Sequence, residues 1–198
     1  MSDEFQRRVR RLYASVGEIE VQDLSQFARL AGATRTGAMT SGTGPTPAQL
    51  ENVAVEMILN VAHIRDGARK TAKALGRDPA DVDRAISGND ALKIVLDLAE
   101  RDKHGGDRRD GGLSRQNPRL SRLIRGVELG APRSESVHIT FGPSGLVATP
   151  EGLLSIVLNG PIVNSKDETV GYFKDVIQEA LRGWEDLFRK WGIIDGAA

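Results

Sequence analysis

Three side chains near the middle of the chain have the types and the spacing for acid–base chemistry on a phosphate ester. Asp97, Arg101 and His104 fall on one strip of a predicted helix, because residues three and four apart share a helix face. An imidazole transfers protons near neutral pH, and a guanidinium binds a phosphate and its developing charge. The spacing predicts an ion pair between Asp97 and Arg101, with His104 as acid or base and Arg101 as a phosphate clamp.

The end of this helix also has an explanation that needs no function. Cations are favoured at the C-terminal end of a helix, and a glycine commonly follows its last residue. Lys103 and His104, followed by Gly105, fit that pattern. The sequence therefore leaves a catalytic histidine and a simple helix end as alternatives.

A second histidine, His63, lies on the preceding predicted helix, where Asp66 one turn later is placed to orient its imidazole. We take His63 as a candidate for a second catalytic histidine. The alternative is a solvated histidine or one that lies between two helices. The third histidine, His138, alternates outward on a predicted strand and is expected at the surface.

Basic residues gather directly after the candidate site. Residues 100–133 hold nine Lys or Arg and five Asp or Glu, and the glycine-rich segment 105–118 is expected to be a mobile loop. Such a surface binds phosphates, although the segment has no aromatic residue on which a base could stack. A solvated, charged loop is the alternative. The candidate nucleic-acid-binding residues are Lys103, Arg108, Arg109, Arg115 and Arg119.

The composition excludes several other chemistries. The 198-residue chain has no cysteine and only three histidines, which removes thiolate nucleophiles and makes a metal site built from imidazoles improbable. The sequence contains no phosphate-loop, dinucleotide, nucleophile-elbow or metalloprotease motif. We therefore expect neither a cofactor nor a metal. The formal net charge of zero argues against a general affinity for polyanions.

The apolar pattern predicts the elements that position these residues. Helices are expected from Pro47 to about Leu75, from about Asn89 to His104, and from Ser165, with Glu168 in a capping box, to Gly192. Short β-branched runs between prolines and glycines predict strands over about 120–160, although residues 120–129 also fit a helix. The fold class is α+β, mainly α: a bundle of three long helices, with a small antiparallel sheet inserted before the last.

The amino-terminal part differs from this core. Residues 1–39 predict an amphipathic helical arm, and residues 40–47, rich in glycine, proline and threonine, predict a linker to a core domain over 48–198. The first residues do not have the apolar centre of a secretory signal, and no run reaches the roughly 20 apolar residues of a membrane span. The expected location is the cytoplasm of a bacterium, away from any membrane.

Three quoted segments carry a resemblance to a known family. The helix with "AHIRD", the next helix ending in "DLAERDKHG" and the last helix with "ALRGWEDLF" resemble the HEPN-type helical domains of bacterial proteins, over roughly residues 47–190. Many members are metal-independent ribonucleases of defence or toxin–antitoxin systems that act as homodimers. Their motif has a longer spacing between arginine and histidine than the two residues between Arg101 and His104.

The resemblance thus implies a metal-independent ribonuclease that acts on RNA. Two alternatives are a non-enzymatic helical module, which forms a homodimer or binds a protein partner, and a regulator that binds nucleic acid through the arginine-rich loop. Under the second alternative, the apolar surface of the last helix around Trp184 and Trp191 is an interface, unless those side chains fill the core.

Overall fold

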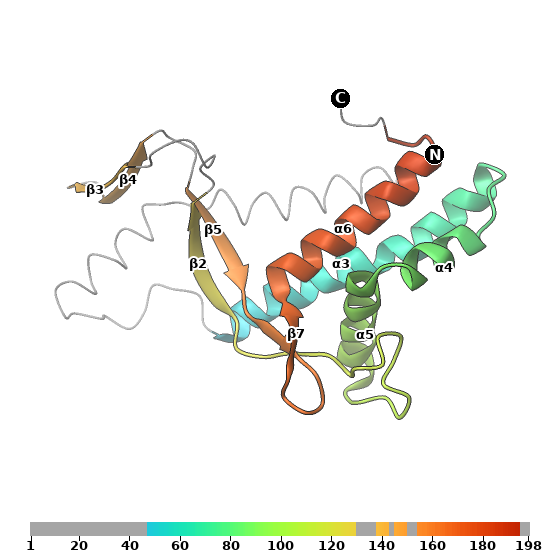
Figure 1. Ribbon diagram of the computed structural model, residues 1–198, viewed down its shortest axis with the longest axis horizontal. Coiled ribbons are helices and arrows are strands. Elements are labelled where there is room, and N and C mark those ends of the chain that lie inside the picture. The colour runs from blue at the N-terminus through green and yellow to red at the C-terminus, as the bar shows by residue number, and fades with distance from the viewer. Residues whose placement is uncertain (1–46, 130–137, 143–144, 150–153, 195–198) are drawn as a thin grey trace.

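The computed structural model describes residues 47–129, 138–142, 145–149 and 154–194. The predicted N-terminal arm (1–39) and all of the linker except Pro47 lie outside the described residues. The described chain is a mainly helical α+β protein, as predicted (Figure 1). Its helices are α3 (Pro47–Ala74), α4 (Ala80–Ser87), α5 (Asp90–His104) and α6 (Phe173–Lys190). Its strands are β1 (Arg119–Leu120), β2 (Ile124–Leu129), β3 (His138–Gly142), β4 (Gly145–Thr149), β5 (Leu154–Asn159), β6 (Pro161–Val163) and β7 (Thr169–Tyr172).

Helices α3 and α5 begin and end where their local signals predicted. The side chain of Asn89 accepts a hydrogen bond from the Leu92 N–H and caps α5. Gly105 ends α5 in the left-handed conformation, with its N–H donating to the Arg101 carbonyl. Gly76 ends α3 in the same conformation, and the following N–H of Arg77 donates to the Ala72 carbonyl.

The short helix α4 is an element that the sequence analysis missed. Its first residue, Ala80, follows two residues after Asp78, and the Asp78 carboxylate accepts a hydrogen bond from the Ala80 N–H at 2.9 Å. Only Val82 and Ile86, one turn apart, are buried, so its apolar pattern is too short to distinguish it from a loop. Its stability depends on contact with the rest of the bundle.

The predicted start of the last helix at Ser165 is wrong. The Asn164 side chain accepts hydrogen bonds from the N–H groups of Lys166 and Glu168 and folds this segment into a turn. Strand β7 follows the turn and pairs with β6. Helix α6 then begins at Phe173, and its Lys174 N–H donates to the Asn159 side chain of strand β5. A side-chain acceptor distant in sequence therefore fixes where α6 starts.

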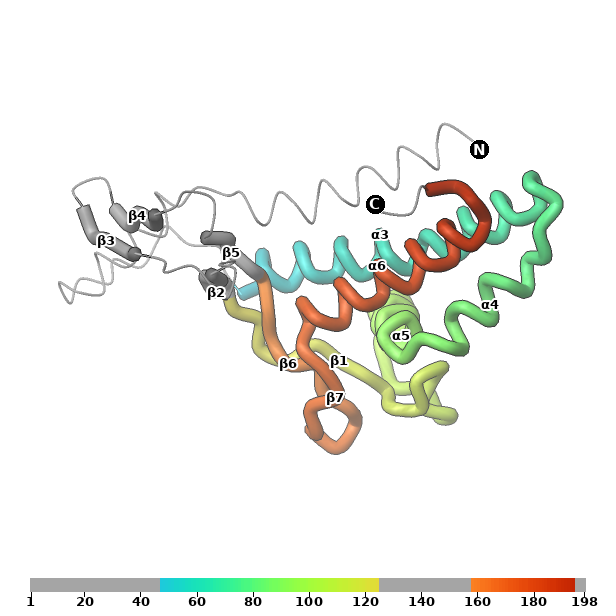
Figure 2. Tube along the Cα trace, turned by 45° about the horizontal axis from the view of Figure 1, so that its top comes forward, coloured from blue at the N-terminus to red at the C-terminus, as the bar shows by residue number. Residues whose placement is uncertain are grey.

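Within the described residues, the strands form three separate antiparallel sheets rather than one. Strands β1, β6 and β7 make a three-stranded sheet, and β2–β5 and β3–β4 are two-stranded. Residues 124–129 are a strand, which decides the open choice between strand and helix for that segment. Strand β2 pairs with β5 from Ile124 opposite Asn159 to Leu129 opposite Leu154. The β2–β5 ribbon rises away from the helices, whereas β6, β1 and β7 lie at the start of α6 (Figures 1 and 2).

The core lies where α3, α5 and α6 pack together, with α6 running beside α3 (Figure 2). Trp184 is 1% exposed, and its indole N–H donates to the Val61 carbonyl of α3 at 3.2 Å. Trp191 is buried as well, so both tryptophans fill the core and do not form an exposed interface. Among the described residues, no helix is long and apolar enough to cross a membrane.

Candidate functional site

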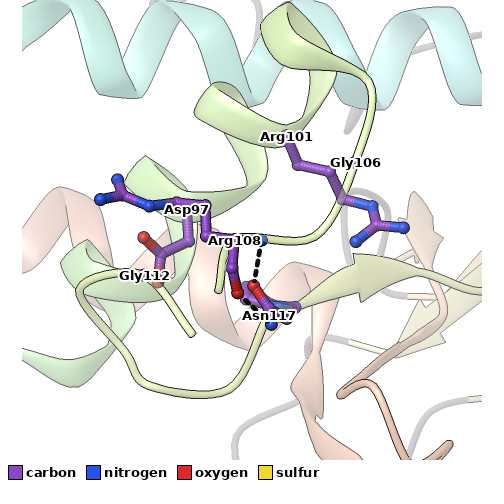
Figure 3. Close-up of a pocket in the computed structure, with 7 residues that line it drawn as sticks. Asp97, Arg101, Gly106, Arg108, Gly112 and Asn117 are labelled. Carbon is purple, nitrogen blue, oxygen red and sulfur yellow. Dashed lines mark hydrogen bonds between the residues drawn. The ribbon is translucent and has the colours of Figure 1, made fainter. Parts of the chain in front are cut away.

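A buried carboxylate on α5 holds the glycine-rich loop that follows this helix. Asp97 is 5% exposed and accepts three hydrogen bonds: from the Leu113 N–H at 2.8 Å, the Ser114 N–H at 2.7 Å and the Ser114 hydroxyl at 2.6 Å. Gly112, with φ of +77°, passes so close that a Cβ there would lie 2.4 Å from the Asp97 Oδ1 (Figure 3). The loop is therefore tied to α5 at the carboxylate.

A second set of hydrogen bonds closes the loop on itself. The Asn117 side chain accepts from the Arg108 N–H at 2.8 Å and donates to the Arg108 carbonyl at 2.9 Å (Figure 3). The Asp110 carboxylate accepts from the Gly112 N–H and from Arg108, and these hydrogen bonds lower the pKa of Asp110 below its ordinary value. Residues 105–118, predicted to be a mobile loop, are thus held by internal hydrogen bonds.

The predicted ion pair between Asp97 and Arg101 is wrong. Asp97 turns toward the loop, and Arg101 extends in another direction to pair with Asp107 (Figure 3). Burial decides this arrangement, because backbone and hydroxyl donors satisfy a buried carboxylate in a fixed geometry that a long, half-exposed arginine does not provide. Asp97 thus positions the loop.

His104 pairs with Glu100, which was not among the predicted site residues. Its Nε2 lies 3.2 Å from the Glu100 Oε2, one turn earlier on α5. The His104 side chain is 62% exposed and that of Glu100 35% exposed. Both line an open hollow of about 300 Å³, together with Gly106, Asp107 and Arg108. The spacing of Glu100 and His104, four residues apart on a helix, was the available signal.

A second, larger hollow lies on another side of the α5 terminus. This groove of about 400 Å³ runs between α3, α5 and β1. Its lining residues are Glu51, Val55, Ile58, Leu98, Arg101, Asp102, Gly105, Arg119 and Leu120. Arg101 and His104, predicted to share one site, therefore line two different hollows. Their link is Asp107, which pairs with Arg101 and lines the hollow of His104.

The basic residues of the loop divide into two groups. Arg108 pairs with Asp110, and Arg119 pairs with Asp167. Lys103, Arg109 and Arg115 are exposed and make no hydrogen bond or ion pair with other described side chains. Neighbouring carboxylates therefore offset part of the predicted positive surface, while the second group is free to contact an anion.

The remaining predicted histidine lies away from these hollows. His63 is exposed on α3, and its neighbour Asp66 pairs with Arg65 at 3.6 Å rather than with the imidazole. The structure therefore does not bring His63 to the lining of either hollow. Among the described residues, no group of three or more His, Asp or Glu side chains is arranged to hold a metal ion.

Comparison of the chain with protein-family models, with curated proteins and with solved structures found no match. The described chain is a mainly helical α+β protein in which two larger, open hollows adjoin the C-terminal end of α5.

Proposed function

We propose that this protein is a metal-independent endoribonuclease, with His104 as its proton-transfer group. The observation that carries this proposal is the Glu100–His104 pair, at 3.2 Å, on the wall of an open hollow that Arg108 also lines. A carboxylate beside an imidazole, with a guanidinium close by, can supply the proton transfer and the charge stabilisation that phosphodiester cleavage needs.

In this proposal each nitrogen of the imidazole has its own role. When Nε2–H donates to Glu100, Nδ1 is left with a lone pair to accept a proton. In the proposed reaction, Nδ1 takes the proton of a ribose 2′-hydroxyl, and O2′ attacks the neighbouring phosphorus. The bond from phosphorus to O5′ breaks, a 2′,3′-cyclic phosphate forms, and the imidazolium returns the proton to O5′.

The cations nearby supply the remaining part of the reaction. Arg108 lines the same hollow, and a guanidinium paired with one carboxylate keeps further N–H donors for the phosphate oxygens. The free Lys103, Arg109 and Arg115 attract the backbone of a single strand. The HEPN-like resemblance extends the proposal to a bacterial defence or toxin–antitoxin role in the cytoplasm, carried out as a homodimer.

The test is cleavage of single-stranded RNA in the presence of EDTA. The wild-type protein is expected to release fragments with 2′,3′-cyclic phosphate ends, and His104→Ala to lower the rate about 100-fold or more. His63→Ala is the matched control, because it removes an exposed histidine outside both hollows and is expected to leave the rate unchanged.

Absence of cleavage by the wild type, or equal cleavage by His104→Ala, would overturn the proposal. RNA binding without cleavage would favour the nucleic-acid-binding regulator. Neither binding nor cleavage, with a stable dimer or hetero-complex unaffected by His104→Ala, would favour the non-enzymatic module.

A further inference from the structure

The groove between α3, α5 and β1 has three kinds of surface within about 400 Å³, a volume in the range of small-molecule sites. Its apolar side chains are Val55, Ile58, Leu98 and Leu120. Its cations are Arg101 and Arg119, and its carboxylates are Glu51 and Asp102. The mixture of apolar side chains with a few charged groups suits a nucleotide, because a base has apolar faces and a polar edge.

The charges of the groove differ in whether they already have partners. Arg101 pairs with Asp107, and Arg119 pairs with Asp167. Glu51 and Asp102 are exposed and make no hydrogen bond or ion pair with other described side chains. The groove thus presents unpaired acceptors beside its apolar wall, and a ligand that fits it carries N–H donors on a flat, apolar body.

We propose that this groove binds a guanine base of the RNA substrate, next to the phosphate that is cleaved. A carboxylate only accepts hydrogen bonds, and guanine is the base whose pairing edge places two N–H donors side by side, at N1 and at N2. Adenine and cytosine present one amino group beside an acceptor nitrogen, and uracil presents one N–H between two carbonyls. The unpaired carboxylates therefore favour guanine over the other three bases.

The arginines place the phosphate toward the hollow of His104. A guanidinium has five N–H donors, so Arg101 and Arg119 keep donors after pairing with Asp107 and Asp167. Asp107 belongs to the wall of the His104 hollow, which makes the Arg101–Asp107 pair the boundary between the two hollows. A base in the groove thus puts its 3′-phosphate at this boundary. In naming RNA as the source of the base, the inference rests on the proposed function.

The experiment is a calorimetric titration of the full chain with guanosine 3′-monophosphate and with its inosine, adenosine, cytidine and uridine counterparts. Guanosine is expected to bind at least tenfold more tightly than adenosine, cytidine or uridine, because a site built for hydrogen bonds rejects ligands that leave its acceptors unpaired. Inosine, which lacks the N2 amino group, is expected to fall between them.

Two variants and one control connect this preference to the groove. Glu51→Gln combined with Asp102→Asn is expected to remove the preference for guanosine over adenosine, since an amide keeps one acceptor oxygen and replaces the other with a donor. Val55→Phe, at a half-buried position of the groove wall, is expected to abolish binding by filling the space. Asp66→Asn removes an exposed carboxylate of α3 outside the groove lining and is expected to change nothing.

The outcomes separate this inference from the ribonuclease proposal. His104→Ala is expected to bind guanosine 3′-monophosphate as the wild type does. Nucleotide binding without RNA cleavage would remove the ribonuclease and leave the groove assignment standing. RNA cleavage with no nucleotide binding, or with equal binding of all five nucleotides, would overturn the groove assignment. A preference that survives the double variant would overturn it as well.

Discussion

Two carboxylates on α5, three residues apart, have opposite surroundings. Asp97 is 5% exposed and accepts three hydrogen bonds from the loop. Glu100 is partly exposed, and its partner is the imidazole of His104 at the wall of an open hollow. A buried, hydrogen-bonded acid stabilises one conformation, whereas a solvent-exposed pair contributes little to stability and can change partners. Asp97 thus fixes the loop to α5, whereas Glu100 lines the hollow together with His104.

The largest expected effect comes from removing the buried acid. Asp97→Ala leaves three loop donors without their acceptor and is expected to lower the free energy of unfolding by about 3 kcal/mol. Glu100→Ala, on the same helix, removes an exposed pair and is expected to cost about 0.5 kcal/mol or less. Urea denaturation of both variants measures the two values. Equal losses in the free energy of unfolding would show that the two carboxylates stabilise the fold to the same extent.

A smaller effect is expected when the contact with Asp97 is crowded rather than removed. Gly112→Ala adds a Cβ against the carboxylate in a backbone conformation with φ of +77°, and a loss of about 2 kcal/mol is expected. Gly106→Ala is the matched control in the same loop, because a Cβ there meets nothing within 4 Å. Urea denaturation of this pair measures the contrast. A tolerated Gly112→Ala would show that the loop shifts without loss.

A third carboxylate, Asp81, is partly buried and lies between Asp97 and Glu100 in its exposure. It accepts hydrogen bonds from Arg84 at 2.8 Å, Lys190 at 3.0 Å and the Trp191 indole at 3.2 Å, and joins α4 to the end of α6. The hydrogen bond from Arg84, followed by those from Lys190 and Trp191, holds the pKa of Asp81 well below its ordinary value of 3.8. A pKa lowered in the folded state stabilises the protein above the unfolded value, and this contribution is lost as the pH falls.

The smallest of these effects, the change in the thermal midpoint caused by Asp81→Asn, is therefore expected to depend on pH. Asp81→Asn lowers the thermal midpoint at neutral pH. Its difference from the wild type narrows as the pH falls below 3.8, because the carboxylate of the unfolded wild-type chain is protonated there before that of the folded protein. Asp186→Asn, which removes an exposed pair with Arg189, is expected to change the midpoint less at neutral pH. Thermal denaturation across this pH range measures both. A difference that stays constant below pH 3.8 would contradict the assignment.

Much of the helical framework was predictable, because its signals lie within a few residues of one another. Asn89 caps α5 through an N–H three residues later, and Gly105 ends it through a carbonyl four residues earlier. For the apolar face of α6 the sequence left core and interface as alternatives, and the structure buries Trp184 in the core. The start of α6 was missed because Asn159, fifteen residues before Lys174, supplies its acceptor.

The candidate site was predictable only in its place along the chain. The sequence identified the end of α5, and the pattern of Glu100 and His104 was present there to be read. The division between two hollows was not predictable, because it depends on the pairing of Arg101 with Asp107 and on the packing of α3 and β1. Side chains on one helix strip share a direction, but burial and loop contacts decide their partners.

The sequence by itself determined the mainly helical α+β class, the limits of α3 and α5, and the basic character of the segment that follows α5. Those properties depend on periodicity, caps and composition, which act locally. Only the tertiary structure decided that Asp97 binds Ser114, 17 residues away, and that Asp81 binds Trp191, 110 residues away. The reason is that a carboxylate accepts hydrogen bonds from whichever donors the folded chain brings to it. Once the carboxylate is buried, losing those hydrogen bonds costs free energy, so the partners stay fixed.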